Sequence, residues 1–430
     1  MSDPKPLRLA IAGLGTVGIG TVRIVRRHAE MLEARAGRPV EIVAVSARSK
    51  DKDRGEDLSA FAWEDDPVAL ATREDVDVYV ELMGGHDGPA KASVEAAIAA
   101  GKHVVTANKA LLAHHGQELA LAAEKAGVSL RFEAAVAGGI PIIKALTEGL
   151  AGNEITRVMG VMNGTCNYIL TRMYDADLPY EEVFEEANQL GYLEADPNLD
   201  VGGIDAGHKL ALLSSIAFGT QVDFDGVELE GIQRISIHDI EAAADMGFRV
   251  KLLGVAQLTG RGLEQRMSPC LVPATSPLGQ LEGGTNMVVV EGDAIGQVVL
   301  RGPGAGEGPT ASAVMGDVMD IARGIDIPTF GQPADTLTRA RTARAAIAAP
   351  YYLRLELVDK PGALAKMASV LGDAGVSIDR MRQYGHDDAA APVLIVTHKC
   401  TRTALDEAIE GFETTGVIAK APVAIRIEEV

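Results

Sequence analysis

The sequence predicts an α/β Rossmann-like domain, an α+β substrate and dimerisation domain, and a C-terminal ferredoxin-like βαββαβ unit. Three observations predict this fold class. Short apolar runs alternate with helix-compatible stretches up to about residue 143. Helices and strands then mix without that regular alternation up to about residue 300. After Pro350 the order becomes strand, helix, strand, strand, helix, strand.

The first region follows the pattern of a parallel sheet covered by helices on both faces. Its strand-like runs are nearly continuous in apolar residues, which is typical of strands buried on both sides. The expected strands are 7–12, 40–45, 76–82, 103–106 and 128–133, and the expected helices are 17–35, 89–99 and 117–125. We expect this domain to cover 1–145 and to be joined by a return segment at 303–328.

The remaining chain divides into a substrate domain at 146–302, a linker helix within 329–350 and the terminal unit at 351–430. In the middle we expect helices at 165–176, 180–189, 203–216 and 310–323, strands at 249–258 and 294–300, and a helix-like stretch at 335–348. In the tail we expect strands at 351–358, 377–384, 392–398 and 423–429, with helices at 363–374 and 402–412.

Composition excludes several classes of function. A formal net charge of −20 and an aromatic content of 4% argue against nucleic acid or an anionic membrane as partner. The three cysteines, Cys166, Cys270 and Cys400, form no CxxC pair, which indicates neither a disulfide framework nor a zinc site. With no apolar signal core and no run of about 20 apolar residues, we expect a cytoplasmic protein that does not contact a membrane.

A glycine-rich turn follows the first expected strand. Its sequence runs Gly13-Leu14-Gly15-Thr16-Val17-Gly18 and opens a helix. The first glycine permits the tight turn, the second lets a pyrophosphate approach the backbone, and the third allows the helix to pack on the strand. The helix N-terminus supplies free N–H groups for the phosphates. This context predicts a dinucleotide cofactor.

The second strand runs into Val45-Ser46-Ala47-Arg48, without the acidic residue that usually binds the ribose of NAD. Arg48, with Lys50, would pair with a 2′-phosphate and so favours NADP. Both residues are equally compatible with ordinary loop cations, which leaves NAD open.

Two further segments carry chemistry. Thr106-Ala107-Asn108-Lys109 follows a strand, where ligands bind in such sheets, although Lys109 is also compatible with a surface lysine. The second segment runs from Glu194 through Asp200 to Asp205 and Lys209. On a helix, Asp205 and Lys209 share one face, and the lysine would then stabilise or protonate an oxygen that gains a hydride. The alternative is an exposed ion pair of little consequence.

Residues 132–141 contain Glu133 followed by a run of small residues. Backbone carbonyls that turn inward here, together with that carboxylate, would hold a hard monovalent cation. Close packing at a domain hinge explains the small residues equally well.

Together these segments resemble homoserine dehydrogenase over nearly the whole chain. The matching stretches are GLGTVG, VVTANKALLA, FEAAVAGGIP, MNGTCNYIL, GYLEADPNLDVGGIDAGHK and GAGEGPTASAV. The resemblance implies NADPH- or NADH-dependent reduction of L-aspartate 4-semialdehyde to L-homoserine, in the biosynthesis of threonine, methionine and isoleucine. It also implies a homodimer or homotetramer.

The same resemblance implies residue roles. Lys209 would donate the proton, Asp205 would orient the substrate and that lysine, and Lys109 would stand between nicotinamide and substrate. Glu194, with Asp200 nearby, would bind the substrate. The implied dinucleotide contacts are Leu14, Thr16, Val17, Arg48 and Gly306, and a structural sodium site would use Glu133 with the backbone of Val136, Gly138 and Ile140. Leu193 departs from the family pattern, where a small residue commonly precedes the glutamate.

Two alternatives remain at this stage, and a third, a semialdehyde dehydrogenase that forms an acyl phosphate, is disfavoured. Another NAD(P)-dependent dehydrogenase of a small amino-acid derivative would share most of these features. A semialdehyde dehydrogenase that forms an acyl phosphate would need a thiolate, but Cys166 opens an apolar helix without a neighbouring histidine, so we interpret it as a packing residue. A catalytically inactive amino-acid sensor is the other alternative.

The tail turn Asp359-Lys360-Pro361-Gly362 resembles that of the ACT domain, which commonly lines an amino-acid site. Gly362 would free backbone N–H groups at a helix N-terminus for a ligand carboxylate. By analogy Asp359, Pro361 and Gly362 would bind L-threonine as feedback effector. An ACT domain that only pairs with another copy is the alternative.

Overall fold

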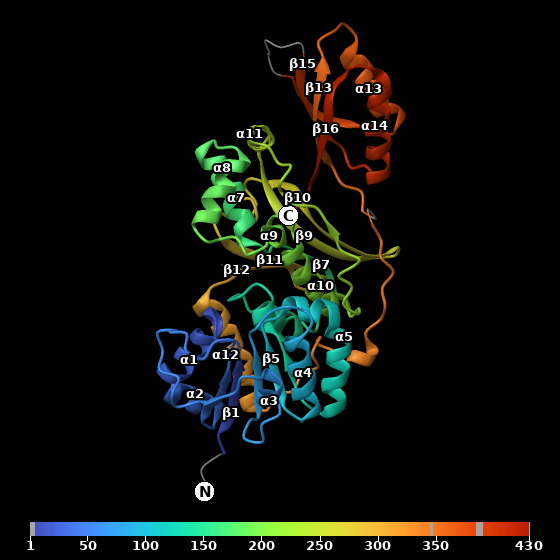
Figure 1. The fold of residues 1–430 in the computed structure, drawn as a ribbon. Helices are drawn as coiled ribbons and strands as arrows, with labels where there is room; N and C mark the ends of the chain where they lie inside the picture. The colour runs from blue at the N-terminus through green and yellow to red at the C-terminus, as the bar shows by residue number, and fades with distance from the viewer. Residues whose placement is uncertain (1–4, 345–346, 384–389, 430) are drawn as a thin grey trace.

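The computed structural model describes residues 5–344, 347–383 and 390–429, and they form three units in a row. The N-terminal unit contains a parallel sheet, the middle unit a mixed sheet with helices on one side, and the C-terminal unit lies at the far end of the molecule (Figure 1). This arrangement confirms the predicted fold class.

The N-terminal sheet has the strand order β3-β2-β1-β4-β5-β6, all parallel, which is the order of dinucleotide-binding folds. Its strands are β1 (Leu7–Ala12), β2 (Val40–Ser46), β3 (Ala62–Trp63), β4 (Val78–Glu81), β5 (His103–Thr106) and β6 (Leu130–Arg131). Its helices are α1 (Thr16–Arg27), α2 (Ala29–Ala36), α3 (Pro67–Ala71), α4 (Pro89–Ala99), α5 (Lys109–Ala126) and the returning α12 (Glu307–Arg323).

Alternate side chains of each strand enter two different cores, because successive residues of a strand point to opposite faces. Ile11 and Val80 pack under α1 and α12, whereas Ala10 and Tyr79 face α4 and α5. The expected helix 17–35 is divided into α1 and α2 at His28, whose φ of −117° and ψ of 22° are not helical.

The middle unit is built on long antiparallel strands, and several of them carried no clear signal in the sequence. The strands are β7 (Ile155–Val161), β8 (Glu228–Leu229), β9 (Phe248–Thr259), β10 (Gly262–Pro273), β11 (Thr285–Gly292) and β12 (Gly296–Pro303). The helical segments are η1 (Glu133–Ala135), α6 (Ile142–Lys144), η2 (Ala145–Gly149), α7 (Gly164–Ala176), α8 (Tyr180–Gln189), α9 (Pro197–Val201), α10 (Ile204–Phe218) and α11 (Ile237–Asp245).

The C-terminal unit has the predicted βαββαβ order. Its elements are β13 (Tyr351–Val358), α13 (Ala363–Asp373), β14 (Ile378–Gln383), β15 (Ala390–Thr397), α14 (Arg402–Thr415) and β16 (Ile418–Ile427). Residue 384, the end of an expected strand, lies outside the described residues. The last strand, β16, also pairs in parallel with β10 through Cys270↔Arg426 and Leu271↔Ile427. One continuous sheet of ten strands therefore joins the C-terminal unit to the middle unit.

The expected linker helix at 329–350 is wrong. Apart from the short turn η3 (Ala334–Thr336), the described part of this segment is extended. Its backbone is hydrogen-bonded to the middle unit instead, from Gln221 N to Thr338 O at 2.9 Å and from Leu263 N to Arg341 O at 2.9 Å. Those partners satisfy the backbone groups that a helix would have paired internally.

Two expectations drawn from composition can be compared with the structure. Within the described residues, no helix is long and apolar enough to cross a membrane. All three cysteines are buried free thiols, as the absence of a CxxC pattern predicts.

Buried charges tie the C-terminal unit to the middle unit. Glu428, directly after β16, is 4% exposed and pairs with Arg266 of β10, with Arg157 of β7 and with Arg426, whose Nε lies 2.6 Å from Glu428 Oε1. A second ion pair joins the C-terminal unit to the middle unit, from Arg354 Nε of β13 to Asp239 Oδ1 of α11 at 2.6 Å. One carboxylate therefore contacts three guanidinium groups at the junction.

Replacing Glu428→Gln should lower the free energy of unfolding by about 3 kcal/mol, because it removes the buried anion that contacts all three arginines. The three arginines hold the pKa of Glu428 below its ordinary value of 4.5 against the opposing effect of burial. The stabilisation is therefore present above that ordinary value and is lost as the pH falls through the folded-state pKa. Urea unfolding at pH 7 and at pH 3 should show a difference between wild type and variant that shrinks at pH 3.

The neighbouring Glu429→Gln is the matched control. Glu429 is exposed and pairs with Lys399 at 2.8 Å, so its loss should cost less than about 1 kcal/mol. Equal urea midpoints for the two variants would contradict the assignment of the junction charges.

Candidate active site

A cleft with a volume of about 670 Å³ lies between the N-terminal and middle units. Its walls bring together residues that are far apart in the sequence, namely Val17, Lys109, Glu194, Asp205, Lys209 and Gly306. The predicted cofactor loop and the predicted catalytic residues therefore line the same space.

The glycine loop has the shape that a pyrophosphate requires. Gly13 has φ of +99°, and a Cβ there would lie 2.4 Å from Leu82 O, while a Cβ on Gly18 would lie 2.0 Å from Gly13 O. Around Gly15, the cap of α1, no atom lies within 4 Å of a built Cβ, so the space beside its backbone is open. A second helix N-terminus borders the cleft, because Gly306 caps α12. The two helix N-termini together favour an anionic ligand.

A buried carboxylate positions Lys109. Glu81, at the end of β4, accepts a hydrogen bond from Thr106 Oγ1 at 2.7 Å, and Thr106 Oγ1 in turn accepts from Asn108 N at 2.9 Å. Asn108 caps α5 by accepting from Leu111 N at 3.0 Å. Lys109 is therefore the first residue of α5, held at the carboxyl ends of β4 and β5.

Helix α10 supplies the central pair. Gly203, with φ of +79°, caps this helix and places Asp205 in its first turn. Lys209 Nζ donates to Asp205 Oδ2 at 2.6 Å and to Met162 O at 2.9 Å. Asp205 and Lys209 are both buried, which excludes the exposed ion pair considered from the sequence.

Lys109 completes a triad around the same carboxylate. Its Nζ lies 2.6 Å from Asp205 Oδ1 and 4.0 Å from Glu194 Oε1. Burial raises the pKa of Asp205, but the two lysines outweigh this effect and bring the pKa far below its usual range. Burial likewise lowers the pKa of Lys109, and the negative charge of Asp205 outweighs it and gives a net rise. The group is therefore one carboxylate between two ammonium ions at neutral pH.

Asp200 holds the loop that carries Glu194. Its Oδ2 accepts from Glu194 N at 2.9 Å and its Oδ1 from Asn163 Nδ2 at 2.9 Å. The Glu194 side chain is half exposed, and burial raises its pKa, an effect that Lys109 opposes. Glu194 is thus available to a ligand in the cleft, whereas Asp200 is engaged by the protein itself.

Glu133 is buried below the cleft. Its two carboxylate oxygens accept from Ile143 N and Lys144 N, both at 2.9 Å. Burial, with the nearby charge of Asp317, raises the pKa of Glu133 to about 7. Ala137 and Gly138 follow with φ of 56° and 53°, so the backbone turns sharply in the segment where inward carbonyls are predicted.

The loop after β2 carries the predicted 2′-phosphate contacts. Arg48 and Lys50 are exposed. Arg54, which was not singled out from the sequence, crosses this loop and donates to Leu14 O at 3.2 Å and to Ser49 O at 2.6 Å. It links the glycine loop to the segment that follows β2.

Cys166 is not placed for nucleophilic chemistry. It is fully buried, its Sγ donates to Asp200 O at 3.3 Å, and burial raises the pKa of the thiol well above its ordinary value. The ring centroid of His208 lies 4.2 Å from that of Phe224. The packing interpretation of Cys166 is consistent with both its burial and its pKa.

The tail residues Asp359, Pro361 and Gly362 lie outside the cleft and are exposed. Gly362 has φ of +84° and caps α13, as the ACT-like turn predicts. The cleft lies between the N-terminal and middle units, whereas this turn belongs to the C-terminal unit, which lies beyond the middle unit (Figure 1).

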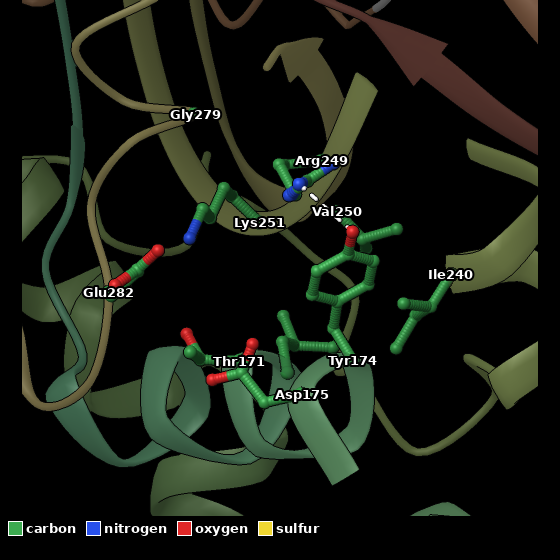
Figure 2. Close-up of a pocket in the computed structure, with 10 residues that line it drawn as sticks. Thr171, Tyr174, Asp175, Ile240, Arg249, Val250, Lys251, Gly279 and Glu282 are labelled. Carbon is green, nitrogen blue, oxygen red and sulfur yellow. Dashed lines mark hydrogen bonds between the residues drawn. The ribbon is translucent and has the colours of Figure 1, made fainter. Parts of the chain in front are cut away.

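A smaller polar pocket lies between α7 and β9 (Figure 2). Figure 2 shows the amine of Lys251 directed toward Glu282, above Thr171 and Asp175. Lys251 Nζ donates to Asn167 Oδ1 at 3.0 Å and to Leu281 O, and burial lowers its pKa to about 8. These contacts tether α7 to the sheet, so we regard this lysine as structural.

Three polar residues of the site gave little sequence signal. Glu81 and Asn286 are buried among apolar strands, and Asn163 is buried directly before α7. Asn163 does cap α7, by accepting from Cys166 N at 2.8 Å, but it also binds Asp200. Their importance depends on contacts between segments distant in sequence.

Family models match most of the chain. The model described as homoserine dehydrogenase matches residues 141–319, that described as homoserine dehydrogenase, NAD binding domain, matches residues 13–133, and that of the ACT domain matches residues 351–410. Each structural unit contains one of the three matches, although the match at 141–319 also includes most of α12, which packs in the N-terminal unit.

Curated relatives and solved structures agree with these matches. The chain is 43% identical to the homoserine dehydrogenase of Neisseria gonorrhoeae and 41% identical to that of Mycobacterium tuberculosis, covering 99% of this chain in each case and 99% and 98% of the relatives. The crystal structure of a homoserine dehydrogenase from Thiobacillus denitrificans superimposes with a TM-score of 0.94 at 40% identity over the full length of both chains. A hyperthermophilic archaeal homoserine dehydrogenase in complex with NADPH has a TM-score of 0.65 at 26% identity, covering 75% of this chain and 99% of that one.

Substituting Gly15→Ala should weaken dinucleotide binding without destabilising the fold. The added methyl would meet no protein atom within 4 Å, but it would occupy the space through which a pyrophosphate approaches. We expect the Kd for the dinucleotide to rise at least tenfold, or about 1.4 kcal/mol. Fluorescence titration with NADPH and with NADH, alongside thermal melting, measures both quantities.

Gly13→Ala is the matched comparison. Its methyl would clash with Leu82 O at 2.4 Å in a left-handed conformation, so it should lower the melting temperature as well as the affinity. A Gly15→Ala protein with unchanged affinity would show that the dinucleotide does not approach this glycine.

Proposed function

The chain belongs to the homoserine dehydrogenase family, and we propose how the residues of its cleft carry out and regulate that oxidoreductase reaction. The reaction reduces L-aspartate 4-semialdehyde to L-homoserine, a step of amino-acid biosynthesis. One observation carries the proposal: two lysines from different units contact one buried carboxylate, Asp205, in the cleft that contains the glycine loop.

Lys209 acts as the proton donor to the oxygen of the reduced aldehyde. An ammonium group has three donors, and the carboxylate of Asp205 and the carbonyl of Met162 accept two of them. The third remains for the substrate oxygen. Because the reduced nicotinamide supplies a hydride to the aldehyde carbon, negative charge develops on that oxygen, and a nearby ammonium stabilises it before the proton is transferred.

Asp205 orients both lysines and keeps them charged. Lys109 holds the opposite side of this carboxylate and borders the space between the glycine loop and the substrate. Glu194 pairs with the α-ammonium group of the substrate, since its carboxylate is half exposed at the cleft. Asp200 supports that contact by fixing Glu194 N. The charged α-carbon end of the substrate is thus held apart from its reacting aldehyde carbonyl.

We infer NADP as the preferred dinucleotide. The end of β2 carries Ser46, Ala47 and Arg48 in place of the acidic residue that usually selects NAD. Arg48 is exposed beside the glycine loop and would pair with a 2′-phosphate. The archaeal relative whose structure contains NADPH supports this preference.

We propose that a structural sodium ion is held by Glu133 with the backbone carbonyls of Val136, Gly138 and Ile140, since carboxylate and carbonyl oxygens suit hard cations. The consecutive left-handed residues at 137 and 138 support such a turn. The ion would rigidify the segment that borders the cleft opposite Lys109, and no step of the reaction passes through it.

We further propose that the ACT domain makes the enzyme sensitive to L-threonine through Asp359, Pro361 and Gly362, as feedback from the end product. We also propose a homodimer or homotetramer in the cytoplasm, consistent with the three unpaired thiols. The catalytically inactive sensor is disfavoured, because such a protein has no need to bury the charges of Asp205 and Lys209.

Lys209→Ala should abolish turnover while leaving cofactor binding intact. Loss of a positioned general acid reduces kcat by about 10² to 10⁴-fold. The assay follows NADPH oxidation with L-aspartate 4-semialdehyde, and fluorescence titration measures cofactor affinity. Cys166→Ala serves as the control that should retain turnover, and the reverse result would favour thiolate chemistry.

Arg48→Ala should raise the KM for NADPH at least tenfold and leave the KM for NADH unchanged, because only NADPH carries the 2′-phosphate. Lys50→Ala, two residues along the same exposed loop, is the matched comparison and should have the smaller effect. An equal change in the two KM values after Arg48→Ala would refute 2′-phosphate recognition by this residue.

A further inference from the structure

Three aromatic rings outside the cleft join the helices that carry the two lysines. His114 lies on α5, five residues after Lys109, and His208 lies on α10, directly before Lys209. The ring centroids of the two histidines are 5.6 Å apart in an edge-on arrangement. The ring of Phe224, in the segment that follows α10, lies 4.2 Å from His208 and 5.4 Å from His114. The N-terminal and middle units therefore meet at these rings as well as at the cleft.

The rings form a second contact between α5 and α10, which pack against each other across the boundary of the two units (Figure 1). The first contact is the ion pair of Lys109 and Asp205 at 2.6 Å, in the first turn of both helices. The ring contact follows five residues later in α5 and three residues later in α10, which is about 4.5 to 7.5 Å along each axis. Two helices joined at one point can still turn about it, whereas a second contact fixes their angle. The ring contact therefore helps to set where Lys109 meets Asp205.

Ring packing alone makes this contact. No hydrogen bond or ion pair of the His114 or His208 side chain with another described residue is found. His208 is buried, at 7% exposed, so a proton on its ring would have little water to solvate it. Two imidazole rings that touch without a carboxylate between them pack best while both are neutral, because two imidazolium ions repel each other.

The groups around His208 keep its ring neutral. Burial has the largest effect on its pKa and lowers it, and the neighbouring His114, Lys109 and His86 lower it further. Asp205, on the same helix, opposes them. The result is a pKa of about 4, well below the ordinary value of 6.5.

The surroundings of His114 act in the same direction. Burial lowers its pKa, and so do His86, whose ring lies 4.5 Å away on the loop after β4, and His115 on the same helix. The carboxylates of Asp225 and Asp87 oppose these effects without reversing them. Both rings of the contact are therefore neutral at pH 7.

We propose that His114 and His208 are positioning residues, whose neutral rings hold α5 against α10 so that Lys109 is set opposite Asp205. Neither ring lines the cleft, so they act on the reaction through the two helices. A displacement of about 1 Å at a catalytic group can reduce the rate about 10²-fold, so a contact that contributes little to folding can still decide turnover. The proposal rests on the proposed function only for the role of Lys109 in the reaction.

The contact carries a pH dependence of known sign. A packed His208 with a pKa of about 4 binds fewer protons between pH 4 and pH 6.5 than a His208 whose helix has separated from α5. The packed arrangement is therefore most stable above about pH 6.5 and loses stability as the pH falls toward 4. A proton on either ring places a cation against the other ring, and this repulsion acts directly between α5 and α10.

The first test is His114→Ala in the full-length enzyme, which removes one ring without changing the lining of the cleft. We expect kcat with L-aspartate 4-semialdehyde to fall at least tenfold, while the Kd for NADPH stays unchanged. His114→Phe keeps a ring at this position and should restore kcat close to the wild-type value. His115→Ala is the matched control and should leave kcat unchanged, since this neighbouring histidine pairs with Asp87 at 3.1 Å and its ring contacts none of the described residues of α10.

The pH profile separates this role from a merely structural one. Between pH 7.5 and pH 5.5 the kcat of the wild-type enzyme should fall more steeply than that of His114→Phe, because phenylalanine takes up no proton and so does not repel His208. A variant that only weakened the fold would lose activity in the same proportion at both pH values.

Chemical modification gives a readout that does not need turnover. Burial lowers the pKa of Lys109, and pairing with Asp205 outweighs that effect, which reduces the fraction of free amine that acetic anhydride attacks. A loosened pair should react at least about threefold faster. Peptide mass spectrometry measures this rate in His114→Ala, in His114→Phe and in the wild-type enzyme, and only His114→Ala should be faster.

Either unchanged kcat or unchanged acetylation of Lys109 in His114→Ala would overturn the proposal. Equal pH profiles for the wild-type enzyme and His114→Phe would overturn it as well. A wild-type enzyme without turnover would instead refute the proposed function, and the acetylation rates would still decide whether the rings hold Lys109 in place.

Discussion

The carboxylate of Asp205 is the constraint on which the catalytic site depends. It is buried and binds two ammonium groups at 2.6 Å, one from α5 of the Rossmann-like domain and one from α10 of the substrate domain. Removing this carboxylate would leave the two lysine amines without the anion that both of them contact, which is the costly change at a buried site. The site therefore exists only while the two domains keep their relative position. Because the carboxylate links them directly, the relative position of the domains and the placement of Lys209 depend on the same contact.

Each lysine is in turn positioned by polar groups that do not touch the substrate. On one side, Glu81 receives Thr106, and Asn108 caps α5, so Lys109 begins its helix at the edge of the sheet. On the other side, Gly203 caps α10 in a left-handed conformation that suits glycine. The two lysines therefore lie on regular helices, and a separate set of polar groups, which do not touch the substrate, positions those helices. That separation explains how Glu194 can remain half exposed while the triad around Asp205 stays fixed.

The sequence predicted most of the fold and most of the cleft because their signals are local. The turn Gly13–Gly18, the strand ends near Lys109 and the i, i+4 spacing of Asp205 and Lys209 can all be read within a few residues. The features that the sequence did not predict depend on contacts with residues distant in sequence. The linker at 329–350 has helical composition but pairs its backbone with Gln221 and Leu263, and β10 and β11 were missed because their registers are fixed only by neighbouring strands. Glu81 was missed for the same reason, since its role depends on Thr106.

The continuous ten-stranded sheet has a mechanical consequence for regulation. An ACT domain attached only by a linker would move without affecting the cleft, but here β16 pairs with β10 and Glu428 joins three arginines from β7, β10 and β16. Such a junction resists small displacements, because buried ion pairs tolerate little change in geometry. Strand β8 also pairs with β10, through Arg266↔Glu228 and Met267↔Leu229. The pairing of β16 with β10 therefore means that the ACT domain cannot move far without moving the sheet that carries the substrate domain.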